Sequence, residues 1–374
     1  MVVKLYITTI ILFREGSTRA FFKMSASYTL TASQRGLRVI IGADYYKIGH
    51  KRMAQNIGHP GNVCAYFEAR VGAKYSKTVV FGIRYYMKQL EGQIITTDVI
   101  DAAERMFAKA FGASPDFDRA KWEYIRDVHD GRLPLKIDAV DEGSLVDVGN
   151  VLFTVMSTDK NCGWLVGYLE TFLSKIWYPS TVSTISHSIK MAMMKHLIGE
   201  EHMDPCDAWN ATHWLLHDFG ARGASSEETS EIGGLSHSLC FGGSDTMSLS
   251  LIASDLYDFN APIVGSVSAT EHWIMTMLGK TKEYDVILKL LQDDSYKDGF
   301  LSMVLDSYDI YAAVDFLCKN ADLVKSRKGR VVVRPDSAKD DEIATQILQI
   351  IETLASTFGH TIVNGKKVLD PHVG

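Results

Sequence analysis

Charged side chains recur in the second half of this 374-residue chain, each close behind a short apolar run. Aspartates alternate there with arginines, and one histidine follows a glutamate. Arginine holds phosphate oxygens through paired N–H donors, whereas aspartate carboxylates bind Mg²⁺ or sugar hydroxyls. This combination favours a site for a phosphorylated sugar with Mg²⁺. The residues concerned are Asp218, Phe219, Arg222, Asp245, Glu271, His272, Asp306, Asp309, Arg334 and Asp336.

The elements that must position these residues form a repeating pattern of strand, turn and helix, which begins near residue 211. The spacing of the repeats is typical of βα units, and hence of a parallel α/β sheet or barrel. Such folds bind ligands at the carboxyl ends of their strands. A single Asp at a strand end is often only a helix N-cap, but five charged strand ends in succession favour a shared site. The predicted strands are residues 214–218, 239–241, 262–267, 301–306 and 330–334.

The first half of the chain has a mixed pattern that predicts an α+β domain. Apolar runs predict strands, residues 99–111 have helical spacing, and the alternation across residues 130–150 is typical of short antiparallel strands. The predicted strands are residues 63–67 and 78–81, and further helices are expected at 164–176 and 183–198. We therefore expect an extension over residues 1–37 that is disordered or not translated, an α+β domain over 38–205, and a partial α/β barrel domain carrying the active site over 206–374.

Composition and short motifs exclude several classes of protein. With 39 Lys and Arg against 45 Asp and Glu, the net charge of −6 argues against a generally basic nucleic-acid-binding protein. Five cysteines without a C-x-x-C pair fit neither a disulfide framework nor a zinc ribbon, and they favour a reducing compartment. No apolar run is long enough for a membrane span. The segment Gly279-Lys280-Thr281 is not a P-loop, because Ile274 stands where that motif needs glycine.

Short segments along the chain resemble the nicotinamide phosphoribosyltransferase family, the type II phosphoribosyltransferases. The similarity extends from about residue 40 to residue 336. It implies an α/β fold, in which an N-terminal α+β domain precedes an incomplete (β/α) barrel-like parallel domain. The segments are DYYKIGH (44–50), YFEAR (66–70), GNVLFTV (149–155), WYPSTVST (177–184), HDFGARGASSEET (217–229), GSDT (243–246), ATEH (269–272), DSYDIY (306–311) and VRPDS (333–337).

The resemblance implies an enzyme, a pentosyltransferase of NAD salvage. Such an enzyme moves the 5-phosphoribosyl group from phosphoribosyl pyrophosphate to nicotinamide, giving nicotinamide mononucleotide and pyrophosphate. Mg²⁺ and ATP, the latter as an activating co-substrate, are the implied cofactors. The implied assembly is a cytoplasmic homodimer with shared active sites and with neither nucleic acid nor membrane as a partner.

The resemblance also implies a role for each matching residue. Arg70, Arg222 and Arg334 would contact phosphate groups, while Asp306 and Asp336 would bind ribose hydroxyls or support the metal, whose ligands stay unassigned. His272 would be phosphorylated when ATP is hydrolysed. Phe219 would stack on one face of the nicotinamide ring and Tyr46 of the partner subunit on the other. Asp245 would accept a hydrogen bond from the carboxamide.

Other functions stay open at the level of sequence. Nicotinate phosphoribosyltransferase is the first alternative, although a carboxylate at Asp245 repels nicotinate. Family members continue beyond the position of Gly374, which is compatible with an incomplete record, a split gene or a truncated protein that has lost activity. The last of these would be a non-catalytic binding or dimerisation protein. A Mg²⁺-dependent phosphohydrolase would leave Phe219, Arg222 and Asp245 without a role.

Overall fold

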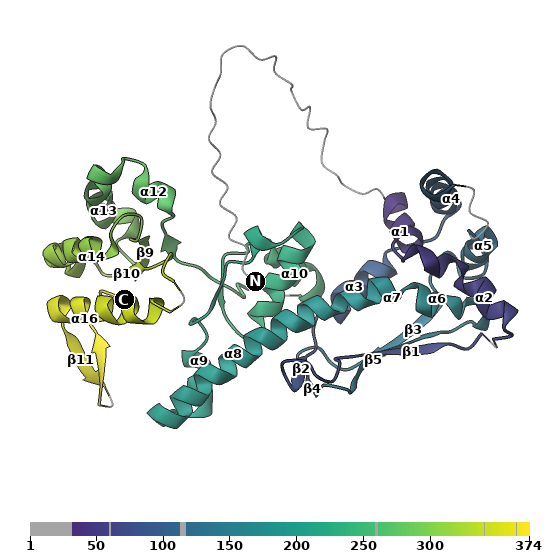
Figure 1. Cartoon of the computed structure of the whole chain (residues 1–374), viewed down its shortest axis with the longest axis horizontal. Helices are drawn as coiled ribbons and strands as arrows, with labels where there is room; N and C mark the ends of the chain where they lie inside the picture. Colours follow the sequence, from purple (N-terminus) through teal and green to yellow (C-terminus); the bar gives the residue numbers. More distant parts are fainter. Residues whose placement is uncertain (1–31, 60, 113–116, 259–260, 340, 364) are drawn as a thin grey trace, which may run out of the picture. The chain divides into compact units, whose positions relative to one another are not determined.

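The computed structural model describes residues 32–59, 61–112, 117–258, 261–339, 341–363 and 365–374 (Figure 1). The chain divides into two compact units. The first runs to Gly58 and also contains Leu90–Pro134, and the second contains His59–Gln89 and Leu135–Gly374. Residues 1–31, most of the predicted extension, lie outside the described residues, and the predicted boundary at residue 205 stays a prediction. No helix in the described ranges has the length and apolar character needed to cross a membrane.

The first unit is helical, and its core forms around one amphipathic helix. Helix α4 buries Val99, Ala103 and Phe107, which share one face because they are four residues apart. Helix α5 adds the fully buried Trp122. An ion pair of 2.8 Å between Lys51 and the N-cap Asp118 ties α2 to the start of α5. The elements are α1 (Ala32–Ile41), η1 (Tyr45–Gly49), α2 (His50–Asn56), α4 (Thr97–Phe111) and α5 (Arg119–Val128).

The second unit begins with antiparallel strands, as the alternating sequence predicts. Strand β5 (Val151–Ser157) lies between β1 (Cys64–Glu68) and β3 (Leu135–Ala139), and both neighbours pair with it in the antiparallel sense. A second antiparallel pair joins β2 (Lys77–Val79) to β4 (Leu145–Asp147). These strands confirm the predictions for the regions around residues 63–67, 78–81 and 130–150.

A long helix packs on β2 through polar side chains instead of an apolar stripe. Helix α8 (Trp177–Glu201) presents Ser180 and Thr184 to that strand, and both are buried. The Thr184 hydroxyl accepts the Val79 N–H at 2.9 Å, and the Ser180 hydroxyl accepts the Phe81 N–H at 3.2 Å. The helix starts six residues before the predicted 183–198. Other helices here are α3 (Ile83–Glu91), η2 (Lys160–Cys162), α6 (Trp164–Tyr168), α7 (Glu170–Leu173), η3 (Ser174–Ile176) and α9 (Pro205–Ala211).

Parallel strands then follow one another in chain order. Strand β6 pairs with β7, the residue Gly243 bridges to Gly265 just before β8, β8 pairs with β9, and β9 pairs with β10. Val331 also bridges in parallel to Val373. Consecutive parallel strands with intervening helices are the order of part of a (β/α) barrel. The strands are β6 (His217–Asp218), β7 (Gly243–Ser244), β8 (Ser268–Ala269), β9 (Phe300–Val304) and β10 (Arg330–Arg334).

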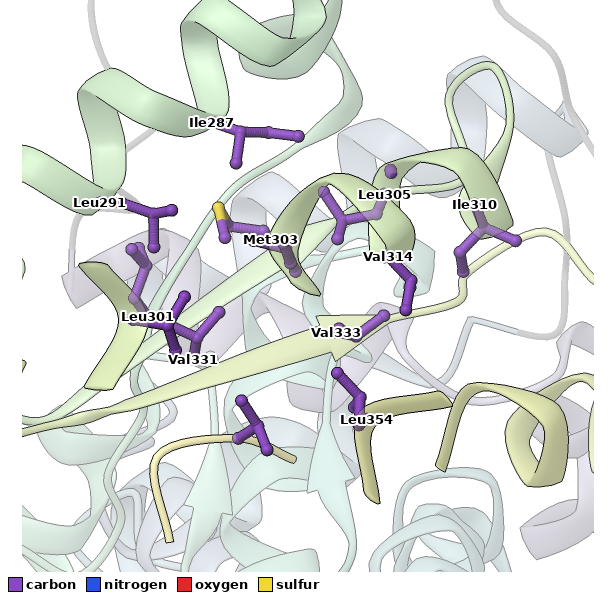
Figure 2. Close-up of a cluster of buried hydrophobic side chains, with 14 of the residues drawn as sticks. Ile287, Leu291, Leu301, Met303, Leu305, Ile310, Val314, Val331, Val333 and Leu354 are labelled. Carbon is purple, nitrogen blue, oxygen red and sulfur yellow. The ribbon is translucent and has the colours of Figure 1, made fainter. Parts of the chain in front are cut away.

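The core of this region surrounds β9 and β10. Four consecutive residues of β9, Leu301 to Val304, are buried, as expected for a parallel strand covered on both faces. In Figure 2, Met303 of β9 and Val333 of β10 lie among side chains of the surrounding helices, including Ile287 of α13 and Leu354 of α16. Elements of this region not yet given are η4 (Ala221–Gly223), α10 (Glu227–Ser238), α11 (Leu249–Tyr257), α12 (His272–Thr276), η5 (Lys280–Lys282), α13 (Glu283–Gln292), η6 (Asp294–Tyr296), α14 (Ile310–Lys319), α15 (Ala321–Lys325), α16 (Ile343–Phe358), β11 (His360–Val363) and β12 (Lys366–Leu369).

Two of the predicted parallel strands are misplaced. The apolar run 239–241 is not a strand: Leu239 caps α10, and the fully buried Phe241 stacks on His237 with ring centroids 5.2 Å apart. The strand lies instead at Gly243–Ser244, where a Cβ on Gly243 would come within 2.6 Å of His217. Likewise a strand was predicted at residues 262–267. There Gly265 forms an isolated bridge, and the strand lies at Ser268–Ala269. At residues 239–243 helix packing and close backbone approach outweigh local apolar character.

Candidate active site

Most of the predicted site residues lie at the carboxyl ends of the parallel strands. Strands β6 and β10 end at Asp218 and Arg334, and Asp245 directly follows β7. His272 opens α12 after β8, and Asp306 follows β9. Carboxyl ends of neighbouring parallel strands share one edge, so these residues come from the same edge of the parallel strands.

One part of this edge combines an aromatic ring with an oriented carboxylate. Phe219 is 59% exposed, and its ring centroid lies 4.7 Å from that of His217. The Ser266 hydroxyl donates a hydrogen bond to Oδ1 of Asp245, and His217 Nε2 lies 3.3 Å from Oδ2. The Asp245 side chain keeps 45% exposure. Its carboxylate is therefore held in one orientation while remaining accessible.

An open pocket of about 700 Å³ adjoins this carboxylate. Its walls come from η4, the start of α10 and the turn that leads into α11. The pocket is mostly lined by small and hydroxyl-bearing residues, with one arginine, one glutamate and one aspartate. The lining residues are Ala221, Arg222, Ala224, Ser225, Ser226, Glu227, Ser230, Asp245, Thr246, Met247, Ser248, Ser250 and Leu251.

The other part of the edge centres on His272. Its Nε2 lies 3.1 Å from Oδ1 of Asp306, and its Nδ1 lies 4.0 Å from Oδ2 of Asp336. The second oxygen of Asp306 accepts the backbone N–H groups of Asp336 at 2.7 Å and Ser337 at 2.6 Å. Burial by itself would raise the pKa of Asp306, but these hydrogen bonds and His272 outweigh it and hold the pKa below its usual value. Asp306 is therefore ionised at neutral pH and favours the His272 tautomer with hydrogen on Nε2.

The predicted arginines differ in their surroundings. Arg334 is half-buried, and its Nη2 donates to the carbonyl of Thr270 at 2.6 Å. The Arg222 side chain is 82% exposed, and its Nη2 lies 3.3 Å from Oε1 of Glu271. Arg222 therefore links the Phe219 region to the helix that carries His272. Arg70 lies exposed after β1, on the antiparallel sheet.

Tyr46 belongs to the first unit, where it lies on η1. Its ring is 62% exposed and lies 5.5 Å from the His50 ring, between centroids. The role implied for this residue concerns a partner subunit, and it stays a prediction.

Three residues of the site are absent from the sequence-based assignment. His217 and Ser266 orient Asp245, and Thr270 holds Arg334 through its carbonyl and the Val304 N–H through its hydroxyl. His217 precedes Asp218 and Phe219 in a segment that carries the family resemblance, so its position gave a signal. Thr270 lies in another such segment, ATEH (269–272), but Ser266 lies in none, and a hydroxyl near a strand end is too common to be noticed by itself.

Comparison with known proteins identifies the family of the chain. Residues 38–137 match the nicotinamide phosphoribosyltransferase N-terminal domain, and residues 214–370 match the nicotinate phosphoribosyltransferase family. A nicotinamide phosphoribosyltransferase of Xanthomonas campestris pv. campestris (strain 8004) is 34% identical over 339 residues, which cover 89% of this chain and 69% of the relative. The chain belongs to the nicotinamide phosphoribosyltransferase family.

A further relative and a solved structure match the chain at lower sequence identity. The nicotinamide phosphoribosyltransferase of Acinetobacter baylyi (strain ATCC 33305 / BD413 / ADP1) is 30% identical over 274 residues, covering 67% of this chain and 53% of the relative. The chain thus spans about half the length of that relative. The crystal structure of human nicotinic acid phosphoribosyltransferase superimposes with a TM-score of 0.52 at 18% identity, covering 84% of this chain and 65% of that one. This similarity supports the α/β fold with its parallel barrel-like part.

Proposed function

We propose that this member of the nicotinamide phosphoribosyltransferase family transfers the 5-phosphoribosyl group from phosphoribosyl pyrophosphate to nicotinamide. The observation that carries the proposal is the Asp245 carboxylate, held by Ser266 and by His217, whose ring centroid lies 4.7 Å from that of the exposed Phe219. An aromatic face next to a fixed acceptor suits a flat ring with a carboxamide. The products would be nicotinamide mononucleotide and pyrophosphate.

The charge of Asp245 favours nicotinamide over nicotinate. One oxygen is bonded to Ser266 and the other faces His217, and each retains a lone pair for a carboxamide N–H. The carboxylate of nicotinate would instead meet a like charge at this position. Nicotinate phosphoribosyl transfer, the alternative suggested by the family that matches residues 214–370, is therefore less favoured.

The phosphate-bearing donor is expected to bind to arginines. Departure of pyrophosphate leaves the sugar carbon oxocarbenium-like, so the site must stabilise the leaving charge and align the ring nitrogen. The exposed Arg222 is free to reach a phosphate, because its one ion pair, with Glu271, is open to solvent. Arg334 and Arg70 are proposed to bind further phosphate oxygens.

Mg²⁺ fits the residues present near His272. Mg²⁺ in phosphate sites takes one or two carboxylates together with substrate oxygens. The Asp336 carboxylate, 52% exposed, is suited to this, whereas both Asp306 oxygens already accept hydrogen bonds. The ion would neutralise charge on the pyrophosphate. Asp306 would then orient His272, and the second lone pair of its Oδ1 would accept a ribose hydroxyl.

His272 is proposed to couple ATP hydrolysis to the reaction. The hydrogen bond from Nε2 to Asp306 leaves the Nδ1 lone pair as the nucleophile. Nδ1 would form an N–P bond to the terminal phosphorus of ATP as the P–O bond to ADP breaks and ADP takes the electron pair. Water would later cleave the N–P bond.

We further propose a cytoplasmic homodimer in which Tyr46 of the partner subunit covers the second face of the nicotinamide ring. The exposed position of Tyr46 on η1 supports this role. The thiols of Cys64, Cys206, Cys240 and Cys318 are free, which agrees with a reducing compartment.

The experiment is a product assay with a matched binding measurement. The purified 374-residue chain is incubated with phosphoribosyl pyrophosphate, Mg²⁺, ATP and either nicotinamide or nicotinate, and both mononucleotides are quantified. Calorimetric titration with each pyridine is run in parallel. We expect product and binding with nicotinamide and much less of both with nicotinate. Equal or stronger binding of nicotinate would contradict the proposed specificity.

A further inference from the structure

Asp218 lies at the end of β6 and makes hydrogen bonds through three of its oxygen atoms. Its Oδ1 accepts the Gly220 N–H at 2.7 Å. Its Oδ2 accepts the Ser244 hydroxyl at 2.8 Å and the Thr246 hydroxyl at 2.7 Å. Its backbone carbonyl accepts the Asp245 N–H at 3.0 Å. A single residue thus connects the turn after β6 to the turn after β7.

The partners of Asp218 flank the two residues proposed to bind the pyridine. Phe219 lies between Asp218 and Gly220, whose N–H donates to the carboxylate. Asp245 lies between Ser244 and Thr246, whose hydroxyls donate to the same carboxylate. Asp218 therefore ties together the two backbone segments that carry Phe219 and Asp245.

The carboxylate of Asp218 is surrounded by hydrogen-bond donors and by helix α10. Ser244 and Thr246 are buried, and their hydrogen bonds to Asp218 are partly buried. Gly234 of α10 allows the close packing, because an added Cβ would lie 3.2 Å from Oδ2 of Asp218. Burial would raise the pKa of Asp218, but the hydrogen bonds from Thr246, Gly220 and Ser244 and the nearby His237 hold it below its usual value.

We propose that Asp218 is a positioning residue that sets the specificity of the pyridine site by fixing Phe219 relative to Asp245. This inference rests on the proposed binding of nicotinamide. Asp218 acts through Gly220, Ser244 and Thr246 and does not itself contact the ligand. Ionised carboxylates form stronger hydrogen bonds than neutral acceptors, which keeps both turns in one arrangement before the ligand arrives.

Replacing Thr246 should have different effects on ligand binding if Asp218 positions the pyridine site and if Asp218 only stabilises the fold. Thr246→Val removes the buried hydroxyl at nearly constant volume, and Thr246→Ser restores it. If Asp218 positions the pyridine site, the valine variant should bind nicotinamide about tenfold more weakly, as for one lost hydrogen bond to a charged group. Binding of phosphoribosyl pyrophosphate should change less than about twofold, because the Thr246 hydroxyl donates to Asp218 and not to a residue proposed to bind phosphate.

The test is a double-mutant cycle measured by calorimetric titration with nicotinamide. Thr246→Val is made in the wild-type chain and in Asp245→Ala, with Thr246→Ser as the rescue and Ser250→Ala as the matched control. Ser250 lines the same pocket, but its hydroxyl donates to Met247 instead of Asp218. We expect the Thr246→Val effect to disappear in the Asp245→Ala chain and to be reversed by serine. Ser244→Ala, which removes the neighbouring hydroxyl, should repeat the result.

Several results would overturn the inference. An equal loss of nicotinamide and phosphoribosyl pyrophosphate binding, or an unchanged Thr246→Val effect in the Asp245→Ala chain, would show only general stabilisation. Failure of the wild-type chain to bind nicotinamide would reject the proposed function itself. Nicotinamide binding by the wild-type chain without coupling between the two positions would reject the positioning role alone.

Discussion

His272 and Asp306 are joined across two neighbouring parallel strands, with 3.1 Å between Nε2 and Oδ1. The first residue opens the helix after β8, and the second follows β9. The other Asp306 oxygen accepts two backbone N–H groups that follow β10. One carboxylate thus connects three consecutive strand ends, and it fixes the imidazole with Nδ1 directed toward Asp336.

Replacing His272 should separate ATP coupling from phosphoribosyl transfer. We expect His272→Ala to abolish stimulation by ATP and to retain slow basal formation of nicotinamide mononucleotide, because Nδ1 is the proposed phosphoryl acceptor. The measurement compares initial rates with and without ATP. His196→Ala, at an exposed position on α8, is the control. Full ATP stimulation in His272→Ala would show that this histidine is only structural.

The stability contributed by Asp306 should depend on pH in a defined direction. Its pKa is lowered in the folded chain, so the contribution is complete above the unfolded value of about 3.9 and is lost as the pH falls through the folded value. Asp306→Ala should lower the free energy of unfolding by about 1–3 kcal/mol near neutral pH, since two N–H groups lose their acceptor. Urea unfolding of both chains at pH 7 and pH 3 measures this. If the difference in free energy of unfolding between the two chains were as large at pH 3 as at pH 7, the prediction would be contradicted.

Phe219 should contribute directly to pyridine binding. We expect Phe219→Ala to weaken nicotinamide binding by about 1–3 kcal/mol, the range for a ring stacked on an aromatic side chain. Phe300→Ala is a matched control. Phe300 is 48% exposed and begins β9, so it lies at the amino end of the strand and not at the carboxyl end. Calorimetric titration of the three chains decides the question. Equal losses in both variants would assign the effect to reduced stability.

The charge at position 245 should determine the choice between the two pyridines. We expect Asp245→Asn to reduce the preference for nicotinamide over nicotinate, because the repulsive charge is removed while the side-chain shape is kept. Asp255→Asn, at an exposed position on α11, is the control. Competition between the two pyridines in one assay gives the ratio. An unchanged ratio in Asp245→Asn would locate the discrimination elsewhere.

Removing the hydroxyl that orients Asp245 should produce a milder form of the same change. Ser266→Ala leaves Oδ1 without its donor, so we expect weaker nicotinamide binding and a smaller preference over nicotinate. Ser266→Thr should restore both if the hydroxyl is what matters. The same competition assay measures this. If Ser266→Ala left the preference for nicotinamide over nicotinate unchanged, His217 alone would suffice to hold Asp245.

Patterns in the sequence predicted the class of fold, and they placed the ends of two of the five parallel strands, at Asp218 and Arg334, where the structure has them. Strand β10 at residues 330–334 was predicted with its observed bounds because its apolar run is bounded by charged residues, and the charged residues that follow the strands lie at one edge of the parallel strands, as predicted. The strand predicted at residues 239–241 was wrong. Phe241 is buried against His237, so the end of this helix is as apolar as a strand.

The hydrogen bonds between these polar side chains follow from the tertiary structure. No local pattern links Ser266 to Asp245, His272 to Asp306, or Asp218 to Thr246, because each pair is separated by at least 21 residues of chain. Residue type and spacing report what a side chain can do. Which acceptor it reaches depends on how neighbouring strands pair, and hydrogen bonds act only over about 3 Å.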